Sequence, residues 1–342
     1  MRILKTTAAL AVAALAVACG GGSSDDGGKG SAATELKLGY FPNITHASAV
    51  YGVASGVYQA ELGATKLKAQ TFNAGPAAVE ALFAGSIDAT YLGPGPAVNA
   101  FIKSKGAVVL VAGATSGGAA LVVRPGVTEL KGKKIADPQT GGTQDIALRA
   151  YLESKSLKVD KQGAGDVSIQ PQENAQTLDL FKAGKLDGAW VPEPWASRLV
   201  LDGGGTVLVD EKTLWPGGKF VTTNLLVRKK FLEEHPDAVK ALIKGQLKAN
   251  EEITADPAKA KTVINGALKT LTGKSLKPAV IDRAFEQIEL TVDPIASSLK
   301  TGADHAFATG LVKQGELKGI YDLSLLEDVT GKTYDDAGLG KG

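Results

Sequence analysis

The sequence has one cysteine, Cys19, and three histidines, His46, His235 and His305, among 342 residues. A lone cysteine cannot form an internal disulfide, and a free thiol in an exported chain needs a chemical role. A zinc or copper site would need histidines and carboxylates from distant segments. No phosphate-binding loop, dinucleotide fingerprint or nucleophile elbow occurs. The sequence therefore predicts no metal, no cofactor, no catalytic residue and no enzyme.

An excess of either charge is also lacking. The chain holds 38 basic and 36 acidic residues, and removing residues 1–18 takes away only Arg2 and Lys5, which leaves 36 of each. Non-specific nucleic-acid binding needs a basic surface. We therefore expect no nucleic-acid partner.

Long apolar runs are lacking as well. Thr6–Ala18 is an uncharged stretch of 13 residues, shorter than the roughly 20 that span a bilayer. It follows Arg2 and Lys5, as the apolar region of a secretory signal follows its basic region. Residues 1–18 are predicted to be a signal peptide.

Ala16-Val17-Ala18-Cys19 resembles a bacterial lipobox, whose cysteine is acylated and becomes the mature N-terminus. Leu15 stands four residues before Cys19, whereas the usual pattern prefers leucine three before it. The alternative is an ordinary signal with an incidental cysteine. Residues 19–34 are rich in glycine and serine and predict a flexible tether. The lipobox implies a lipid anchor in the bilayer, at the outer face of the cytoplasmic membrane, with more than one acyl chain.

Short β-type runs alternate with helical segments through glycine- and proline-bearing turns. This order predicts largely parallel sheets with helices on both faces. The expected strands are 36–41, 66–72, 87–92 and 107–112, and the expected helices are 47–59, 76–84, 94–104, 143–153, 237–253, 257–271, 277–288 and 296–315.

Two internal echoes predict a pair of similar α/β lobes. Ala84–Pro94 recurs 99 residues later as Ala183–Glu193, with the same order of turn glycine, aliphatic-Asp, aromatic and proline-bearing loop. Leu121–Arg124 is echoed by Leu225–Arg228. The alternative is coincidence between ordinary strands and helix ends. The expected first lobe is discontinuous. It comprises 35–122 and 225–342, the second lobe comprises 124–222, and a hinge lies near Val123 and Leu226.

Three segments resemble one family. They are Gly39–Ala47 (GYFPNITHA), Asp137–Asp145 (DPQTGGTQD) and Gly188–Trp195 (GAWVPEPW). They resemble the substrate-binding proteins of ABC importers of the aliphatic sulfonate, taurine and nitrate type, over Leu36 to Val329. The resemblance implies the type II periplasmic-binding fold, two doubly wound lobes joined by two crossing strands. It also implies a ligand cleft between the lobes and a monomer that delivers its ligand to permease subunits.

In such folds ligands lie beyond the carboxyl ends of strands, where loops lead into helices. The first N–H groups of a helix are unpaired and attract anions. The alternative for each loop is a plain βα turn. The predicted ligand-binding residues are Phe41, Asn43, Gly75, Pro76, Gly93, Pro94, Ser116, Gly117, Thr140, Gly141, Gly142, Thr143, Glu193 and Trp195.

Two of these residues keep alternative roles. Glu193 either binds an amine or caps the following helix with Arg198. Trp195, with Tyr40 or Phe41, forms either an apolar wall of the site or ordinary core. The expected ligand is an aliphatic sulfonate or taurine, then nitrate, bicarbonate or a heterocyclic vitamin precursor. An enzyme on the same fold is the remote alternative, because such enzymes need a cysteine-rich segment and an active-site histidine.

Overall fold

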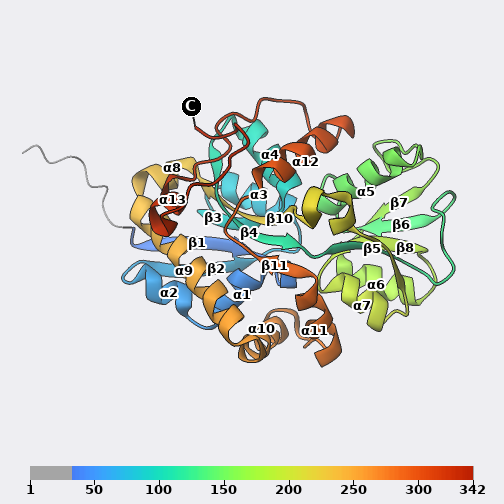
Figure 1. The fold of residues 1–342 in the computed structure, drawn as a ribbon, viewed down its shortest axis with the longest axis horizontal. Coiled ribbons are helices and arrows are strands. Elements are labelled where there is room, and N and C mark those ends of the chain that lie inside the picture. The colour runs from blue at the N-terminus through green and yellow to red at the C-terminus, as the bar shows by residue number, and fades with distance from the viewer. Residues whose placement is uncertain (1–32, 342) are drawn as a thin grey trace, which may run out of the picture. The chain divides into compact units, whose positions relative to one another are not determined.

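The computed structural model describes residues 33–341, which form two α/β lobes around two separate sheets (Figure 1). The predicted signal peptide, Cys19 and nearly all of the predicted tether lie outside the described residues. The tether was predicted to extend to residue 34, but Ala33 and Thr34 already belong to the folded body. Their carbonyls accept hydrogen bonds from the Thr65 hydroxyl at 2.8 Å and the Lys66 N–H at 3.0 Å.

The first lobe contains a six-stranded sheet in the order β11-β4-β10-β3-β1-β2. Strand β1 is parallel to β2 and β3, whereas β10 is antiparallel to β3 and β4. The strands are β1 Glu35–Tyr40, β2 Lys66–Thr71, β3 Ala89–Leu92, β4 Val108–Gly117, β10 Val221–Arg228 and β11 Ile288–Leu290. The helices are η1 Ile44–His46, α1 Ala47–Ala54, α2 Val57–Leu62, α3 Gly75–Phe83, α4 Pro94–Ser104, α8 Lys229–Glu234, α9 Pro236–Ala255, α10 Pro257–Thr272, α11 Pro278–Glu286, α12 Ala296–Ala308 and α13 Ser324–Thr330.

The second lobe contains a five-stranded sheet in the order β7-β6-β8-β5-β9. Strand β6 is parallel to β7 and β8, and β5 is antiparallel to β8 and β9. Its strands are β5 Ala119–Val123, β6 Lys134–Asp137, β7 Ser168–Pro171, β8 Gly188–Pro192 and β9 Thr206–Asp210. Its helices are α5 Thr143–Ser154, α6 Asn174–Lys182 and α7 Trp195–Leu201; η2 Glu211–Leu214 and η3 Pro216–Gly218 lead back to the first lobe.

The chain crosses between the sheets at two adjacent places. It leaves the first sheet at Gly117-Gly118, between β4 and β5, and returns between β9 and β10. The Gly117 N–H donates to the Phe220 carbonyl at 3.3 Å, and the Thr222 hydroxyl donates to the Gly117 carbonyl. Both crossings lie before the predicted boundaries at 122–124 and 222–225. The prediction missed them because β4 and β5 are apolar runs separated only by small residues.

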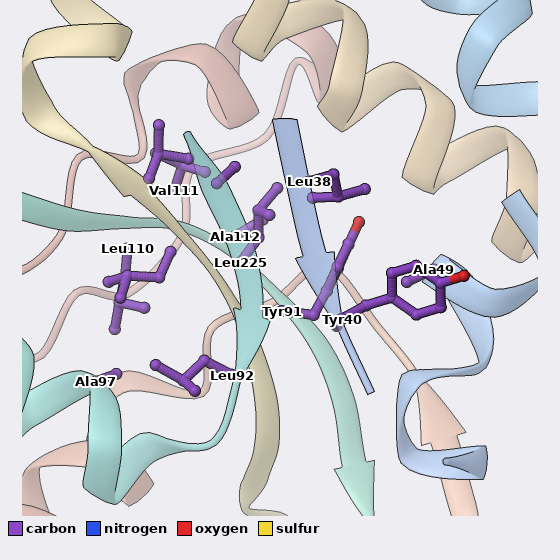
Figure 2. Close-up of a cluster of buried hydrophobic side chains, with 14 of the residues drawn as sticks. Leu38, Tyr40, Ala49, Tyr91, Leu92, Ala97, Leu110, Val111, Ala112 and Leu225 are labelled. Atoms are coloured by element: carbon purple, nitrogen blue, oxygen red, sulfur yellow. The ribbon is translucent and has the colours of Figure 1, made fainter. Parts of the chain in front are cut away.

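Buried apolar side chains cover both faces of the first sheet. Figure 2 shows Tyr91 and Leu92 from β3 beside Leu110 and Ala112 from β4 and Leu225 from β10. Ala49 of α1 and Ala97 of α4 are buried in the same cluster. A sheet with two apolar faces needs helices on both sides, so the predicted doubly wound arrangement is confirmed. The prediction of largely parallel sheets is wrong, because β10 and β5, which follow the crossings between the lobes, pair antiparallel with both of their neighbours, and β11 is antiparallel to β4.

Several predicted elements differ in detail from the structure. The expected helix 47–59 is two helices, α1 and α2. Gly56 lies between them with a left-handed φ of 81°, which a continuous α-helix does not allow. The expected helix 277–288 ends at Glu286, and β11 follows it. The expected helix 296–315 ends at Ala308, shortly before Gly310, whose φ is 66°.

Candidate ligand-binding site

A cavity of about 50 Å³ lies where the carboxyl ends of the parallel strands of both sheets face each other. One water molecule needs roughly 10–15 Å³ by such a measure, so the space suits a small polar group. The cavity is lined by Phe41, Asn43, Thr45, His46, Asn73, Ala74, Gly75, Gly93, Pro96, Pro138, Gln139, Gly142, Thr143, Gln144, Asn174, Pro192, Thr222 and Thr223.

Four helices begin at this cavity, two from each lobe. Helices α3, α4, α5 and α6 start at its wall, and none of the four has a side chain bonded at its N-cap. Their first N–H groups lack partners within the helix and carry partial positive charge. Pro94 and Pro96 leave α4 with only the Gly95 N–H among its first three residues. The free N–H groups and partial positive charge at the cavity therefore come mainly from α3, α5 and α6.

No Asp, Glu, Lys or Arg lines the cavity. Its histidine, His46, is fully buried, and desolvation lowers the pKa of His46 to about 3. The Phe41 N–H donates to His46 Nδ1 at 3.3 Å, and the two rings stack at 4.5 Å. A neutral imidazole whose Nδ1 accepts carries its proton on Nε2. His46 is therefore an uncharged hydrogen-bond donor.

Two threonines and two amides give the cavity acceptor character as well. The Thr222 and Thr223 hydroxyls donate to the carbonyls of Gly117 and Thr45, respectively, so their lone pairs remain for other donors. Gln139 Oε1 and Asn174 Oδ1 are buried without a hydrogen-bond partner in the protein. Buried polar atoms are normally paired, and these two are available to a bound molecule.

The two lobes meet closely at the start of α4. A Cβ atom on Gly93 would lie 2.1 Å from Thr143 Oγ1, and one on Gly95 would lie 2.6 Å from Ile146 Cδ1. Both threonine and isoleucine belong to α5 of the other lobe. Asn43 Oδ1 also accepts from Trp195 Nε1 across the cleft at 3.2 Å. The structure thus describes a closed arrangement of the lobes.

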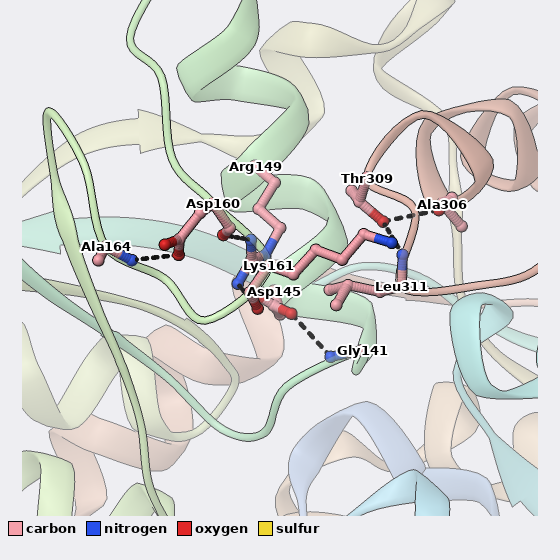
Figure 3. Close-up of polar contacts among 9 residues, drawn as sticks. All are labelled: Gly141, Asp145, Arg149, Asp160, Lys161, Ala164, Ala306, Thr309 and Leu311. Carbon is pink, nitrogen blue, oxygen red and sulfur yellow. Dashed lines mark hydrogen bonds and ion pairs between the residues drawn. The ribbon is translucent and has the colours of Figure 1, made fainter.

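Side chains behind the cavity fix the loop that leads into α5 (Figure 3). Asp145 accepts from the Gly141 N–H at 2.7 Å and from Arg149 Nε at 2.6 Å, and Arg149 also donates to the Asp160 carbonyl at 2.7 Å. Burial, with the nearby Asp145 charge, raises the pKa of Asp137 well above its usual value. The loop is therefore anchored by the Asp145–Arg149 ion pair, and Asp137 at its start is a buried carboxyl whose ionisation is disfavoured by desolvation and by the Asp145 charge.

Six of the predicted residues line the cavity, namely Phe41, Asn43, Gly75, Gly93, Gly142 and Thr143. Pro76 and Pro94 lie in the first turns of α3 and α4 and fix the helix starts without lining the cavity. Ser116 and Gly117 lie on the crossing strand, and the Thr222 hydroxyl occupies the Gly117 carbonyl. Thr140 is exposed, and the Gly141 N–H is bonded to Asp145.

Glu193 and Trp195 lie outside the cavity. Glu193 is buried, accepts from the Ser197 N–H at 3.0 Å and lies 3.5 Å from Arg283 Nη1, and burial raises the pKa of Glu193. This geometry favours the capping alternative, with Arg283 as partner in place of Arg198. Arg198 instead lies 3.5 Å from Asp202 and 4.6 Å above the Trp195 ring.

Other lining residues were not singled out from the sequence. Asn73 belongs to the same strand-to-helix loop, 73–76, as the predicted Gly75 and Pro76. His46 and Gln144 each stand one residue beyond such a loop, 41–45 or 140–143, so a wider window would have found them. Asn174 follows β7, a short strand that the periodicity did not reveal. Thr222 and Thr223 lie inside β10, where no loop pattern marks them. Within residues 33–341 no cluster of three or more histidine, cysteine or acidic residues could hold a metal ion. In the same range, no helix combines the length and apolar character needed to cross a membrane.

Known proteins resemble this chain in sequence and in fold. The taurine-binding periplasmic protein of Escherichia coli (strain K12) is 31% identical over 60% of this chain, and the match spans 62% of that protein. The alkanesulfonate-binding protein SsuA from Xanthomonas axonopodis pv. citri, bound to MOPS, has a TM-score of 0.69. It is 22% identical, and the alignment covers 83% of this chain and 96% of SsuA.

The nitrate-binding protein NrtA from Synechocystis PCC 6803 has a TM-score of 0.73 and 18% identity, with 87% of this chain and 89% of NrtA covered. These two structural likenesses establish the periplasmic-binding fold that the sequence predicted. The model of the NMT1-like family matches residues 29–267, more than half of the sequence. The chain is therefore a member of the NMT1-like family.

Proposed function

We propose that this chain is the extracytoplasmic substrate-binding component of an ABC importer and delivers a small organic anion to the permease. An aliphatic sulfonate or taurine is the preferred ligand. The observation that carries the proposal is the meeting of four uncapped helix starts, from both lobes, at a cavity without charged side chains. The relatives named above bind taurine, alkanesulfonates and nitrate according to their names.

The cavity chemistry fits a sulfonate head group. A sulfonate has no proton to donate at neutral pH, so it needs hydrogen-bond donors. Backbone N–H groups at the helix starts and the Nε2–H of neutral His46 supply them. Each helix start contributes roughly 0.3–1 kcal/mol, and up to about 2 kcal/mol when partly buried. Four such ends would supply a large part of the roughly 8 kcal/mol of a micromolar complex.

Calorimetric titration with taurine, ethanesulfonate and nitrate tests the proposal. The sharpest variant is Thr143→Val, which removes a hydroxyl at the cavity and keeps the shape of the side chain. A hydrogen bond to a charged group contributes roughly 1.5–3 kcal/mol, so we expect at least a tenfold loss of affinity for the bound anion. Thr140→Val is the matched control, because Thr140 is exposed and does not line the cavity.

Different outcomes separate the alternatives. Glu193→Gln should change taurine and ethanesulfonate affinities equally, because Glu193 contacts Ser197 and Arg283 outside the cavity. A loss confined to taurine would restore an amine-binding role for Glu193. If the wild-type protein bound none of the anions, the anion proposal would fail and a heterocyclic vitamin precursor would become the first candidate.

We also propose that Cys19 is acylated and anchors the protein to the membrane. The lipobox-like Ala16–Cys19 segment and the glycine-rich residues after it support this. Cys19→Ala should move the protein from the membrane fraction to the soluble exported fraction. Retention of the variant in the membrane fraction would contradict acylation as the anchor.

A further inference from the structure

The loop that leads into α5 begins at a buried acid without hydrogen-bond partners. Asp137, the last residue of β6, is 0% exposed, and no residue of 33–341 donates a well-aligned hydrogen bond to either of its side-chain oxygens. Buried polar atoms are normally paired, and a buried charge without donors is strongly disfavoured. An ionised Asp137 would therefore be a buried charge that no hydrogen bond stabilises.

The local geometry places Asp137 opposite Asp145. Side chains two residues apart on a strand share a face, so Asp137 lies on the same face of β6 as Ile135. Ile135 is buried in one apolar cluster with Leu148 and Leu152 of α5. Asp145 precedes these leucines by three and seven residues, which places it on the same side of that helix. The two acids therefore meet between the end of β6 and the first turn of α5, where Asp145 is also 0% exposed.

A single arginine faces these two acids among the residues that the structure describes. Arg149 of α5 is 6% exposed, and its Nε lies 2.6 Å from Asp145 Oδ1 (Figure 3). Strands β7 and β8, on either side of β6, carry no charged residue, and neither does the loop 138–142. Burial and then the Asp145 charge raise the pKa of Asp137, against the weaker effects of Arg149 and the Gln139 N–H. One cation thus balances one carboxylate, and the second acid is neutral only if it holds a proton.

Asp145 holds the loop whose end forms part of the ligand cavity. Its Oδ2 accepts from the Gly141 N–H at 2.7 Å, while its Oδ1 is paired with Arg149. Gly142 and Thr143, the next two residues after this bond, line the cavity. The orientation of the Asp145 carboxylate therefore helps to set where the free N–H groups at the start of α5 point.

We propose that Asp137 holds one proton, donates it in a hydrogen bond to Asp145, and so acts as a positioning residue for the anion site at the start of α5. The shared proton leaves one carboxylate for the one guanidinium. Loss of the proton would set two buried carboxylates against each other and add a negative charge behind the cavity. Anion binding should therefore take up a proton, and anion affinity should fall as pH rises through the raised pKa of Asp137. The affinity effect rests on the proposed function, whereas the shared proton does not.

Infrared spectroscopy of the full chain with isotope-labelled aspartate tests the shared proton directly. A protonated carboxyl has a C=O stretch that a carboxylate lacks, and the label separates aspartic acid from glutamic acid, Glu211 included. Asp137 is the aspartate of residues 33–341 whose pKa is raised. We expect an aspartic acid band in the wild-type protein at neutral pH and its loss in Asp137→Asn. Absence of the band from the wild-type protein would overturn the inference without requiring any variant to fold.

Calorimetric titration with ethanesulfonate over a range of pH tests the positioning role. Asp137→Asn keeps an N–H donor for Asp145 and cannot ionise, so its affinity should match that of the wild type at low pH and stay level as pH rises. Asp137→Val has no donor and leaves Asp145 short of a partner, so we expect an affinity loss of about fivefold or more. Leu152→Ala is the matched control, because it disturbs the packing of α5 at the end away from the cavity and should leave affinity unchanged.

The outcomes separate this inference from the proposed function. Equal affinity losses in Asp137→Asn and Asp137→Val, or the same fall of affinity with pH in Asp137→Asn and the wild type, would overturn the positioning role. An equal loss in Leu152→Ala would assign the effect to general destabilisation and would overturn that role as well. If the wild type bound no sulfonate, the proposed function would fail, and the infrared band would still decide whether Asp137 holds its proton.

Discussion

The two lobes repeat one strand order around differently stabilised interiors. The first sheet runs β2-β1-β3-β10-β4 and the second runs β7-β6-β8-β5-β9, with parallel and antiparallel neighbours at the same positions. The first sheet adds β11 at its outer edge, and the helices from α8 onward give that lobe a larger core. The two lobes therefore share the arrangement of five strands, and this arrangement places the helix starts at the cleft.

An aspartate occupies the same place in both frames. Asp88 accepts from the Lys37 N–H at 2.9 Å, and Asp187 accepts from the Lys134 N–H at 2.8 Å. Asp88 also forms an ion pair with Arg228, the last residue of β10, with 2.5 Å between Asp88 Oδ1 and Arg228 Nη2. The repeated sequence segment therefore reflects a hydrogen bond that ties β1 to the turn before β3 in the first lobe and β6 to the turn before β8 in the second.

The aromatic residue of the repeated segment, Tyr91 in the first lobe and Trp190 in the second, has different polar partners in the two lobes. In the first lobe the Tyr91 hydroxyl bonds to Tyr58 at 2.7 Å and to Gln246 at 2.9 Å. In the second lobe Trp190 Nε1 donates to the buried Glu211 at 2.8 Å. The first network is neutral, whereas the second contains an ionisable acid. The lobes should therefore differ in how their stability depends on pH.

The largest expected effect is on that pH dependence. Desolvation raises the pKa of Glu211 from 4.5 to about 7. The folded state then holds a proton that the unfolded state releases, so stability falls as pH rises from about 4.5 to about 7. One pKa unit corresponds to 1.36 kcal/mol, so the full loss is about 3 kcal/mol. Urea unfolding at pH 5 and pH 8 should show that Glu211→Gln removes this loss; the same pH dependence in wild type and variant would contradict it.

A smaller effect should separate the two echoed aspartates. Asp88→Asn keeps an oxygen that can accept from the Lys37 N–H but leaves Arg228 without its anion. Hydrogen bonds to charged groups contribute roughly 1.5–3 kcal/mol to stability. Asp187→Asn loses no such cation, because the Asp187 side chain accepts from the backbone N–H of Lys134 and forms no ion pair with any residue of 33–341. We expect a destabilisation of about 2 kcal/mol for Asp88→Asn and less than about 1 kcal/mol for Asp187→Asn. Equal losses in urea unfolding would show that the ion pair contributes little.

The smallest expected effect concerns the contact between the lobes. Gly93 has an ordinary φ of −72°, so Gly93→Ala strains no backbone, but its Cβ would collide with Thr143 of the other lobe. Overpacking costs roughly 1–3 kcal/mol, which corresponds to at least a fivefold loss of ligand affinity. Small-angle scattering should show weaker ligand-driven closure. Gly266→Ala is the control, since nothing lies within 4 Å of its Cβ; equal affinities of the two variants would argue against closure at Gly93.

Much of the frame could be predicted because local patterns encode it. Gly75, Gly93, Gly142 and Thr143 stand at turns from strand to helix, where glycine, proline and hydroxyl residues mark the helix start. Ser116 and Gly117 share that composition but serve the crossing, where Gly117 and Gly118 have φ of 76° and 79°. Composition alone does not separate a turn toward a ligand from a turn between sheets.

Other features depend on contacts distant in sequence. The neutral state of His46 follows from its burial and from the Phe41 N–H. The placement of Thr222 and Thr223 follows from the antiparallel pairing of β10 with β4. Glu193 was an open choice because its partner, Arg283, lies 90 residues away and reaches it only when α11 packs on α7 (Figure 1).

A crystal structure of the protein with hexanesulfonate would show which groups of the protein bind the anion. We expect the sulfonate oxygens within hydrogen-bond distance of backbone N–H groups at the starts of α3, α5 or α6, from both lobes, and of His46 Nε2. We also expect no charged side chain within 4 Å of the sulfur, because none lines the cavity. A sulfonate held instead by Arg198 or Arg283, with the cavity unaltered, would contradict an anion site built from helix starts and neutral donors.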